Sequence, residues 1–266
     1  MKYSREFTGE FLGTFMLILF GCGAVANSVL FDSYHGVVQV ALMWGIGAML
    51  STYTTRHLSG SHFNPALTIA MAVNKRLDWK KVPAYLIAQF TGAFVAALMV
   101  YGLFSSSIIH FENAHKIVRG TPESVSVSKM FGEYYLATGN SNIMSMLHAM
   151  AAETLGTFLL VLVIFALTED RNLGKPDSNL VPVFIGFTVS SVVCFIANFT
   201  QAGLNPARDF APRMVAWIFG WGQAAFPDRI GGFFYVYMLA PVIGALIAGF
   251  VFTKVLCRLW QRPAHI

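Results

Sequence analysis

Six long apolar segments alternate with short polar connections along the 266-residue chain. Each is about 20 residues long, the length that an α-helix needs to cross the apolar core of a bilayer. The pattern therefore predicts six membrane-spanning helices, three in each half of the chain. Their approximate bounds are 7–30, 36–55, 82–104, 148–168, 179–199 and 232–257. Two further helical stretches, at 64–74 and 205–217, are too short to cross.

The chain is an internal duplication. The segment Glu10–Phe15 (EFLGTF) returns 143 positions later as Glu153–Phe158 (ETLGTF), and the tripeptide at 64–66 returns 141 positions later at 205–207. Two unrelated landmarks with nearly equal offsets indicate a repeat of about half the chain. Because each half has three spans, the two halves must cross the membrane in opposite directions.

We therefore expect one membrane domain over residues 1–266, built from inverted repeats at about 1–104 and 148–260. An outer connection over 105–147 joins the repeats, and its length suggests either a tether across the bundle or a functional loop.

The repeated tripeptide is Asn-Pro-Ala, at Asn64-Pro65-Ala66 and Asn205-Pro206-Ala207. Asn is a preferred N-cap and Pro suits the first turn of a helix, so each tripeptide predicts a helix start after extended backbone. Short helices at matching places in two halves are typical of a site at the membrane midplane. Irregular backbone survives at this depth only where it lines a cavity, so its carbonyls should face a lumen. The predicted pore-lining carbonyls are those of Ser61, His62, Phe63, Gly203 and Leu204.

The composition supports a membrane protein and excludes most other classes. The chain is 56% hydrophobic and 12% charged, whereas a soluble domain is about 25% charged. The net charge of +5 does not indicate a nucleic-acid partner, because the basic residues flank the apolar segments. Twelve lie on the predicted inner side and six on the outer, which favours cytoplasmic termini. We interpret the first apolar segment as a retained span and not a cleaved signal peptide, because it recurs within the chain.

No cluster of His, Cys and carboxylates and no nucleophile pair appears, so we expect no enzyme, metal or cofactor. The three cysteines fall in apolar runs without metal or redox spacing.

The segments Ser59–Ala66 (SGSHFNPA) and Gly203–Asp209 (GLNPARD) resemble the motifs of the aquaporin superfamily, and within it of the glycerol facilitators. The resemblance covers nearly the whole chain. It implies an all-α hourglass of six spans plus two re-entrant half-helices, one pore per subunit of a homotetramer, and passive passage of glycerol and water. It also implies a multi-pass protein of a plasma membrane or a bacterial inner membrane.

The two half-helix starts suggest how ions and protons would be excluded. A helix N-terminus carries roughly half a positive elementary charge, and two facing each other at the midplane repel cations. The amides of Asn64 and Asn205 would donate hydrogen bonds to a passing oxygen. A water molecule that accepts from both amides cannot easily relay a proton along a single file of water molecules in the pore.

The resemblance assigns the outer selectivity filter to Trp44, Val193, Ala202 and Arg208. A flat Trp face opposite an Arg would match the apolar and hydroxyl edges of glycerol. Val193 and Ala202 are small, so we expect a wide opening. Glycerol facilitators often carry an aromatic where Ala202 falls, and this set is similar to that of plant nodulin-type channels.

Other positions differ in whether they fit the glycerol facilitators. Tyr237-Met238 departs from the Pro-Leu pair of glycerol facilitators, whereas Asp209 and Arg213 fit that branch. We expect Asp209 to have a structural role. A water-selective channel of the same fold remains the nearest alternative.

Glu10 and Glu153 are carboxylates within apolar spans. A proton relay would make the protein a proton-coupled secondary transporter, which is the second alternative. The resemblance implies instead that each carboxylate bonds backbone N–H groups of the irregular stretch beside its half-helix, and their repeat relationship favours this structural role.

Overall fold

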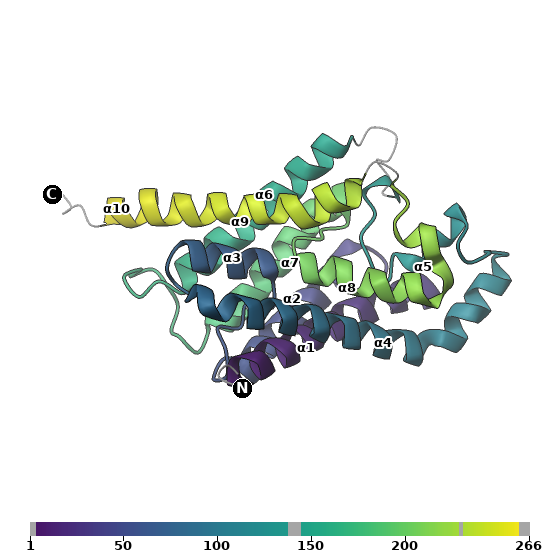
Figure 1. The fold of residues 1–266 in the computed structure, drawn as a ribbon, viewed down its shortest axis with the longest axis horizontal. Helices are drawn as coiled ribbons and strands as arrows, with labels where there is room; N and C mark the ends of the chain where they lie inside the picture. The colour runs from purple at the N-terminus through teal and green to yellow at the C-terminus, as the bar shows by residue number, and fades with distance from the viewer. Residues whose placement is uncertain (1–3, 138–144, 229–230, 261–266) are drawn as a thin grey trace.

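The computed structural model describes residues 4–137, 145–228 and 231–260, and the described part is helical with no strand. It contains six helices long and apolar enough to cross a membrane, as the sequence predicts. The first five are α1 (Ser4–Phe31), α2 (Val37–Thr55), α4 (Val82–Ala114), α6 (Met146–Leu167) and α7 (Val181–Thr200). The sixth, Phe234–Trp260, joins a π-helical turn η6 (Phe234–Leu239), α9 (Ala240–Phe250), a second π-helical stretch η7 (Val251–Leu256) and α10 (Cys257–Trp260). Figure 1 shows these helices running roughly along the long axis of the molecule.

The two short helices are α3 (Pro65–Val73) and α8 (Pro206–Ala216). They begin near the centre of the molecule and run toward opposite ends (Figure 1). Both begin at the proline of the repeated tripeptide, with the preceding asparagine as N-cap in extended conformation. Nine and eleven residues give lengths of about 14 and 17 Å, roughly half of the apolar thickness of a bilayer.

The third span is longer than the sequence predicts. We expected it to end near residue 104, but α4 continues to Ala114, so its 33 residues extend over about 50 Å. The predicted end was placed where the residues become polar. The Ser and His residues after position 104 are polar, but they do not break a helix. The connection between the halves therefore begins at His115, and it holds η2 (Pro122–Ser124), α5 (Val125–Ser128) and η3 (Tyr135–Ala137).

The remaining short elements flank the spans. They are η1 (Trp79–Lys81) before α4, and η4 (Trp217–Trp221) and η5 (Gly222–Ala225) after α8. Lys2, Arg229 and Arg262, which enter the charge count of the sequence, lie outside the described residues.

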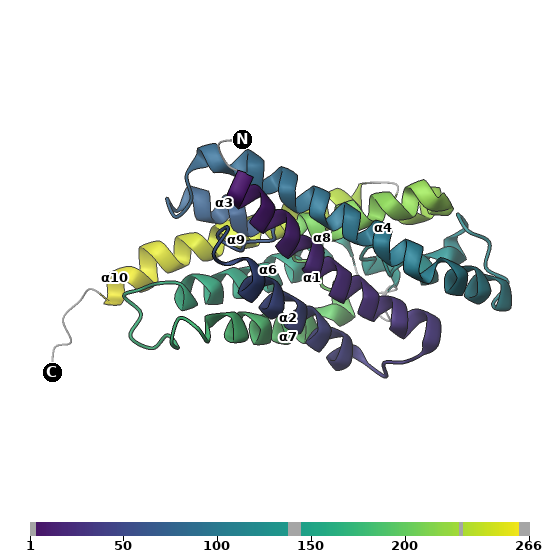
Figure 2. The ribbon, with the colours of Figure 1, turned by 90° about the horizontal axis from the view of Figure 1, so that it is seen from below.

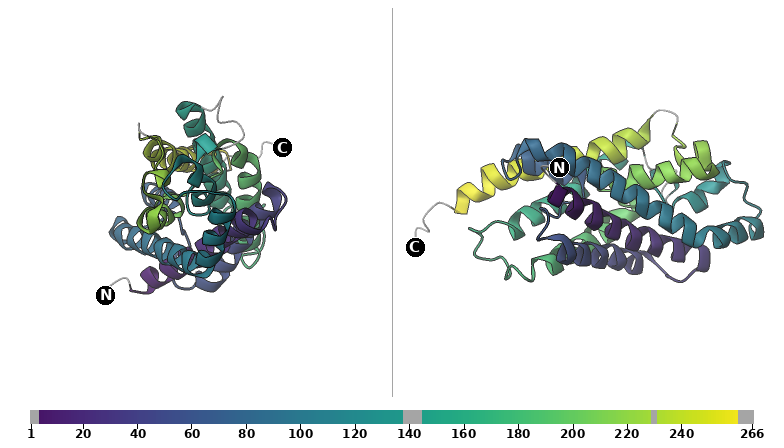
Figure 3. Two further views of the ribbon diagram at one scale, coloured as in Figure 1. Left: turned by 90° about the vertical axis from the view of Figure 1, so that its right-hand side faces the viewer. Right: turned by 60° about the horizontal axis from the view of Figure 1, so that its bottom comes forward.

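Each short helix packs into the bundle formed by the other half of the chain. One apolar core joins α1, α2 and α4 with Ala211 and Val215 of α8. The other joins α6, α7 and the last span with Leu67 and Met71 of α3. The views in Figures 2 and 3 show the same arrangement, with α8 beside α4 and α3 beside α9. The two halves therefore interlock, and neither could complete its core alone.

Glycines allow the closest helix contacts. Gly45 of α2 and Gly186 of α7, 141 positions apart, face each other so closely that a Cβ on either would collide with the backbone of the other. Gly92 of α4 abuts the carbonyl of Phe11, and Gly244 of α9 abuts that of Thr154 in the same way. Small residues at such contacts let helices in lipid approach closely.

Candidate functional site

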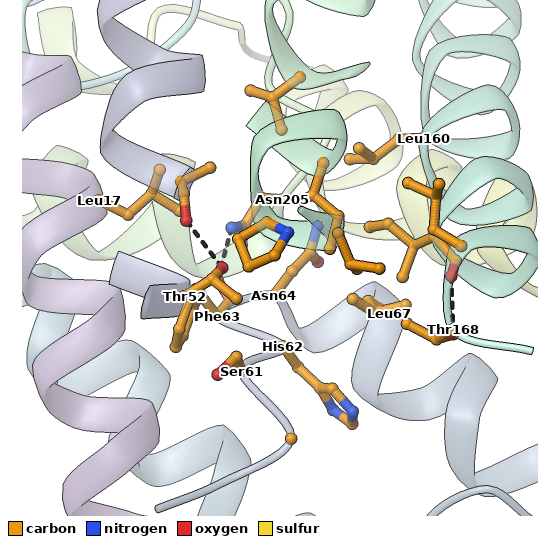
Figure 4. Close-up of a pocket in the computed structure, with 18 of the residues that line it drawn as sticks. Leu17, Thr52, Ser61, His62, Phe63, Asn64, Leu67, Leu160, Thr168 and Asn205 are labelled. Carbon is orange, nitrogen blue, oxygen red and sulfur yellow. Dashed lines mark hydrogen bonds between the residues drawn. The ribbon is translucent and has the colours of Figure 1, made fainter. Parts of the chain in front are cut away.

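An elongated cavity of about 320 Å³ runs between the two halves. Its lining extends from Trp44 and Arg208, past Asn64 and Asn205, to Arg56 near the start of the α2–α3 connection. Figure 4 shows the two asparagines close together in the lining, with Leu17 on one side and Leu67 and Leu160 on the other. Apolar walls with a few convergent polar groups are typical of a small-solute site.

Most of the predicted site residues meet in this cavity. Those in its lining are Trp44, Ser61, His62, Phe63, Asn64, Val193, Ala202, Gly203, Leu204, Asn205 and Arg208. The others are buried behind the lining, and they are Glu10, Pro65, Ala66, Glu153, Pro206, Ala207 and Asp209.

The two asparagines cap their own helices and bind the opposite half. Asn64 Oδ1 accepts from the N–H of Ala66 at 2.8 Å, and Asn205 Oδ1 accepts from those of Ala207 and Arg208 at 3.0 and 3.2 Å. Asn64 Nδ2 donates to the carbonyl of Leu204 at 2.9 Å. Asn205 Nδ2 donates to the carbonyl of Phe63 at 2.7 Å.

These crossed bonds use one N–H of each amide and leave the second for another acceptor. They also change what the sequence suggested for two carbonyls. The carbonyls of Phe63 and Leu204 already accept a bond that joins the halves, so only their second lone pair is open to a solute.

The backbone before each half-helix alternates into the left-handed region. Ser61 and Phe63 have φ of 52° each, and Ala202 and Leu204, 141 positions later, have φ of 66° and 56°. Such non-glycine residues are strained and tend to occur at functional sites. Successive N–H groups in this geometry form a concave nest that binds anions.

A glutamate occupies each nest. Glu10 accepts from the N–H groups of His62 at 3.0 Å and Phe63 at 2.8 Å. Glu153 accepts from those of Gly203 at 2.8 Å and Leu204 at 2.6 Å. Both carboxylates are fully buried. Because a trans peptide is planar, the carbonyl that precedes each of these N–H groups points away from the glutamate.

The first nest has further side-chain support that the sequence did not reveal. Gln89 of α4 donates to Glu10 at 2.8 Å and to Thr68 of α3 at 2.9 Å. His62 Nδ1 lies 3.1 Å from the same Thr68 hydroxyl, and its ring lies 5.0 Å from that of Tyr85. A polar Gln in an apolar span was the available signal, but its partner could not be identified without the fold.

The second nest is supported by Tyr237, which together with Met238 replaces the Pro-Leu pair expected from the resemblance. Its hydroxyl donates to the carbonyl of Thr200 at 2.9 Å, and its ring packs against Gly203, where a Cβ would press on it. Tyr237 therefore packs its aromatic ring behind the stretch that precedes Asn205 and stabilises it.

The predicted filter residues lie together, but in a different relation from the expected one. The guanidinium carbon of Arg208 is 4.2 Å from the centre of the Trp44 ring, so the two side chains stack and no solute fits between them. The stacked pair lines the cavity together with the small Val193 and Ala202. The apolar face and the donor are therefore adjacent walls.

Arg208 also has a buried partner that sequence reasoning missed. Its guanidinium forms an ion pair with the carboxylate of Glu133, which comes from the connection between the halves. The backbone N–H of Glu133 donates to Asp209 at 2.7 Å. The signal in the sequence was an aromatic cluster around this residue, Phe131–Tyr135 (FGEYY), which is buried despite lying in a polar connection.

Asp209 and Arg213 hold that connection in place. Arg213 donates to Asp209 at 2.7 and 3.1 Å, to the carbonyl of Glu133 at 2.5 Å and to that of Ala225 at 2.7 Å. Its guanidinium also lies 4.6 Å from the centre of the Tyr134 ring. The pair is fully buried and satisfied by hydrogen bonds, which is what a buried ion pair needs to be tolerated.

The other end of the cavity is framed by the connection between α6 and α7. Lys175 and Asp170 form an ion pair at 2.5 Å in the lining, and Arg56 donates to the carbonyl of Ser178 at 3.1 Å. Tyr53 donates to the carbonyl of Asn179 at 2.5 Å. These contacts hold the connection against α2 beside the opening.

Comparison with known proteins gives a consistent result. The family model described as "Major intrinsic protein" matches residues 1–252. The glycerol uptake facilitator protein of Haemophilus influenzae is 41% identical over 247 residues, which cover 92% of this chain and 91% of that protein. The corresponding protein of Escherichia coli strain K12 is 38% identical over 94% of this chain and 87% of its own length. The X-ray structure of the aquaglyceroporin from Plasmodium falciparum superposes with a TM-score of 0.80 at 28% identity, covering 97% of this chain and 98% of that one.

Proposed function

The chain belongs to the major intrinsic protein family, and on that basis we propose that it is a passive channel for glycerol and other small uncharged solutes, with water alongside. The observation that supports this most is the crossed pair of asparagine bonds within a continuous, mostly apolar cavity. A solute that enters exchanges hydrogen bonds with fixed groups along the lining. Its passage needs no chemical step, so we propose no catalysis.

Four residues are proposed as the filter. Arg208 supplies donors, Trp44 supplies an apolar face, and Val193 and Ala202 leave the width that a carbon chain with hydroxyls needs. The positive ends of α3 and α8 at Asn64 and Asn205 exclude cations and interrupt proton transfer along the file. The carbonyls of the two nests offer acceptors to the hydroxyls of the solute.

We propose that the two halves are inverted repeats of one domain, with both termini in the cytoplasm and four subunits in the assembly. This is supported by the even number of spans and by the positions of the helix termini. The start of α1 and the end of α10 lie toward the same end of the molecule (Figure 1). The membrane is a plasma membrane or a bacterial inner membrane.

The proposal is tested by stopped-flow light scattering on vesicles that hold the purified protein. The wild type should re-swell quickly in glycerol after the first shrinkage. Ala202→Trp fills the wide side of the filter and should lower glycerol flux by about tenfold or more, with a smaller loss of water flux. Phe187→Trp, which places the same indole on the exposed outer surface of α7, is the matched control and should behave as the wild type.

Fast water flux with glycerol excluded from the wild type would contradict the proposal and support a water-selective channel. A glycerol flux that follows an imposed pH gradient would instead support proton coupling. The hydrogen bonds that occupy both buried glutamates argue against coupling.

A further inference from the structure

The charges along the proposed pore account for the exclusion of cations but not of anions. The positive ends of α3 and α8 point at the centre, and Arg208 places a full positive charge in the filter. A pore with only these charges would attract small anions, because a buried charge acts strongly in a medium of low dielectric constant. A negative charge at the same depth would offset this attraction.

Glu133 supplies that charge. Its carboxylate pairs with the guanidinium of Arg208, and both side chains are buried, with 4% and 6% of their surface exposed. Asp209 forms its ion pair with Arg213, whose guanidinium donates to both of its oxygens, so the positive charge of Arg208 is left to Glu133.

Hydrogen bonds fix both the N–H and the carbonyl of Glu133, and they therefore fix the position from which its side chain extends. Its N–H donates to Asp209 and its carbonyl accepts from Arg213, at 2.7 and 2.5 Å. Arg208, Arg213, Asp209 and Glu133, two buried cations and two buried anions, therefore form one neutral group at the filter. Removing the Glu133 carboxylate leaves Arg208 as an uncompensated charge in the cavity lining.

We propose that Glu133 is a specificity-determining residue whose carboxylate neutralises Arg208 and thereby keeps small monovalent anions out of the pore. This inference rests on the proposed channel function and adds the residue that completes its exclusion of ions. The connection between the halves, which lies outside both repeats, then contributes directly to selectivity.

The test compares nitrate with glycerol in the same vesicles. A potassium nitrate gradient is applied with valinomycin present, so that potassium follows and nitrate entry is limited by the protein. The readout is the ratio of nitrate flux to glycerol flux. Glu133→Gln keeps the size of the side chain but replaces one acceptor oxygen with an NH₂ group and removes the charge. Its ratio should rise on the order of tenfold or more over the wild type. Glu133→Asn removes the same charge and replaces Glu133→Gln in this measurement if that variant does not assemble.

Two controls separate charge from other effects. Glu123→Gln removes an exposed carboxylate from the same connection and should leave the ratio at the wild-type value. The double variant Glu133→Gln/Arg208→Gln removes both charges of the pair, and its ratio should return toward the wild type although the filter is wider.

The inference is overturned if a neutral Glu133 variant that still passes glycerol shows the wild-type ratio. It is also overturned if the double variant leaks nitrate as much as Glu133→Gln, because the leak would then reflect size and not charge. A wild type that passes no glycerol contradicts the channel function itself, which is a distinct result.

Discussion

At the scale of single residues, Glu10 and Glu153 supply hydrogen-bond acceptors to backbone stretches that have no helical hydrogen bonds of their own. The stretches before the half-helices form no helical hydrogen bonds, and alternate residues have positive φ. Buried N–H groups without acceptors are costly, and each carboxylate satisfies two of them. Glu10 additionally accepts from Ser59 at 2.7 Å and from Gln89, so all of its bonds require an acceptor and none requires a proton donor.

Glu10→Gln should therefore destabilise the protein and reduce flux together. A Gln side chain has only one oxygen, so its NH₂ group would face the N–H of His62 or Phe63. Each donor left without an acceptor costs about 1–3 kcal/mol. The thermal unfolding midpoint in detergent, measured beside glycerol flux, checks this.

Glu6→Gln is the matched control, one turn earlier on α1, where Glu6 forms a partly exposed ion pair with Lys81 at 2.8 Å. Its effect should stay below about 1 kcal/mol. Loss of flux in Glu10→Gln with an unchanged midpoint would favour the proton-coupled alternative.

At the scale of elements, the half-helices depend on close contacts with the first span of each repeat. Gly13 of α1 lies against the ring of Phe63, and Gly156 of α6, 143 positions later, lies against the side chain of Leu204. Phe63 and Leu204 each precede a capping asparagine and carry the carbonyl that the opposite asparagine binds. The position of each half-helix start is thus set by the absence of a side chain on the neighbouring span.

Gly13→Ala should destabilise the protein, whereas Gly23→Ala on the same helix should not. A Cβ at Gly13 would overlap the Phe63 ring, and overpacking typically costs about 1–3 kcal/mol. A Cβ at Gly23 has no atom within 4 Å, and Ala is the better helix former. Unfolding midpoints and glycerol flux of the two variants check this, and equal behaviour would contradict the packing argument.

At the scale of the whole molecule, the interlocked halves are also joined at the end opposite α5. Arg76, just after α3, pairs with Glu169, just after α6, at 2.5 Å, and lies 4.5 Å from the centre of the Phe165 ring. The hydrogen bond from Arg171, together with the charges of Arg76 and Arg171, lowers the pKa of Glu169 below its usual value.

Because the folded-state pKa is lowered, this contribution to stability is present above the unfolded pKa of about 4.3 and is lost as the pH falls below it. Glu169→Gln should therefore flatten the dependence of the unfolding midpoint on pH between about 5 and 3. Asp32→Asn, at an exposed carboxylate between α1 and α2, is the control and should retain the wild-type slope. A slope in Glu169→Gln equal to that of the wild type would contradict the role of this ion pair.

The orientation of the whole molecule is open to a labelling test. Leu173, between α6 and α7, and Val118, after α4, are exposed. The α6–α7 connection and the C-terminal end of α4 lie toward opposite ends of the molecule (Figure 1). With cytoplasmic termini, Val118→Cys should react with an impermeant maleimide on intact cells, and Leu173→Cys only after permeabilisation. The parent chain is the blank, because two of its three cysteines are buried and Cys194 lies outside the cavity lining. The reverse pattern would place the termini outside.

Much of this architecture was predictable because its signals are local or repeated. Span length follows from the thickness of the bilayer, and the half-helix starts follow from a capping Asn followed by Pro. The agreement of two offsets indicated the duplication. The pairing of Glu10 and Glu153 with their nests was anticipated only through the family resemblance, since nothing local in the sequence identifies the N–H groups that they bind.

The sequence by itself determined the class of the protein, its six spans, its two short helices and the residues that approach the central cavity. Only the tertiary structure decided how those residues are used. It placed Arg208 against Trp44 and not across an opening from it, crossed the asparagine bonds between halves, and brought Glu133 from the connection to Arg208. The physical reason is that helix starts and span lengths depend on neighbouring residues, whereas these contacts join residues 75 to 164 positions apart, which only the packing of the two halves brings together.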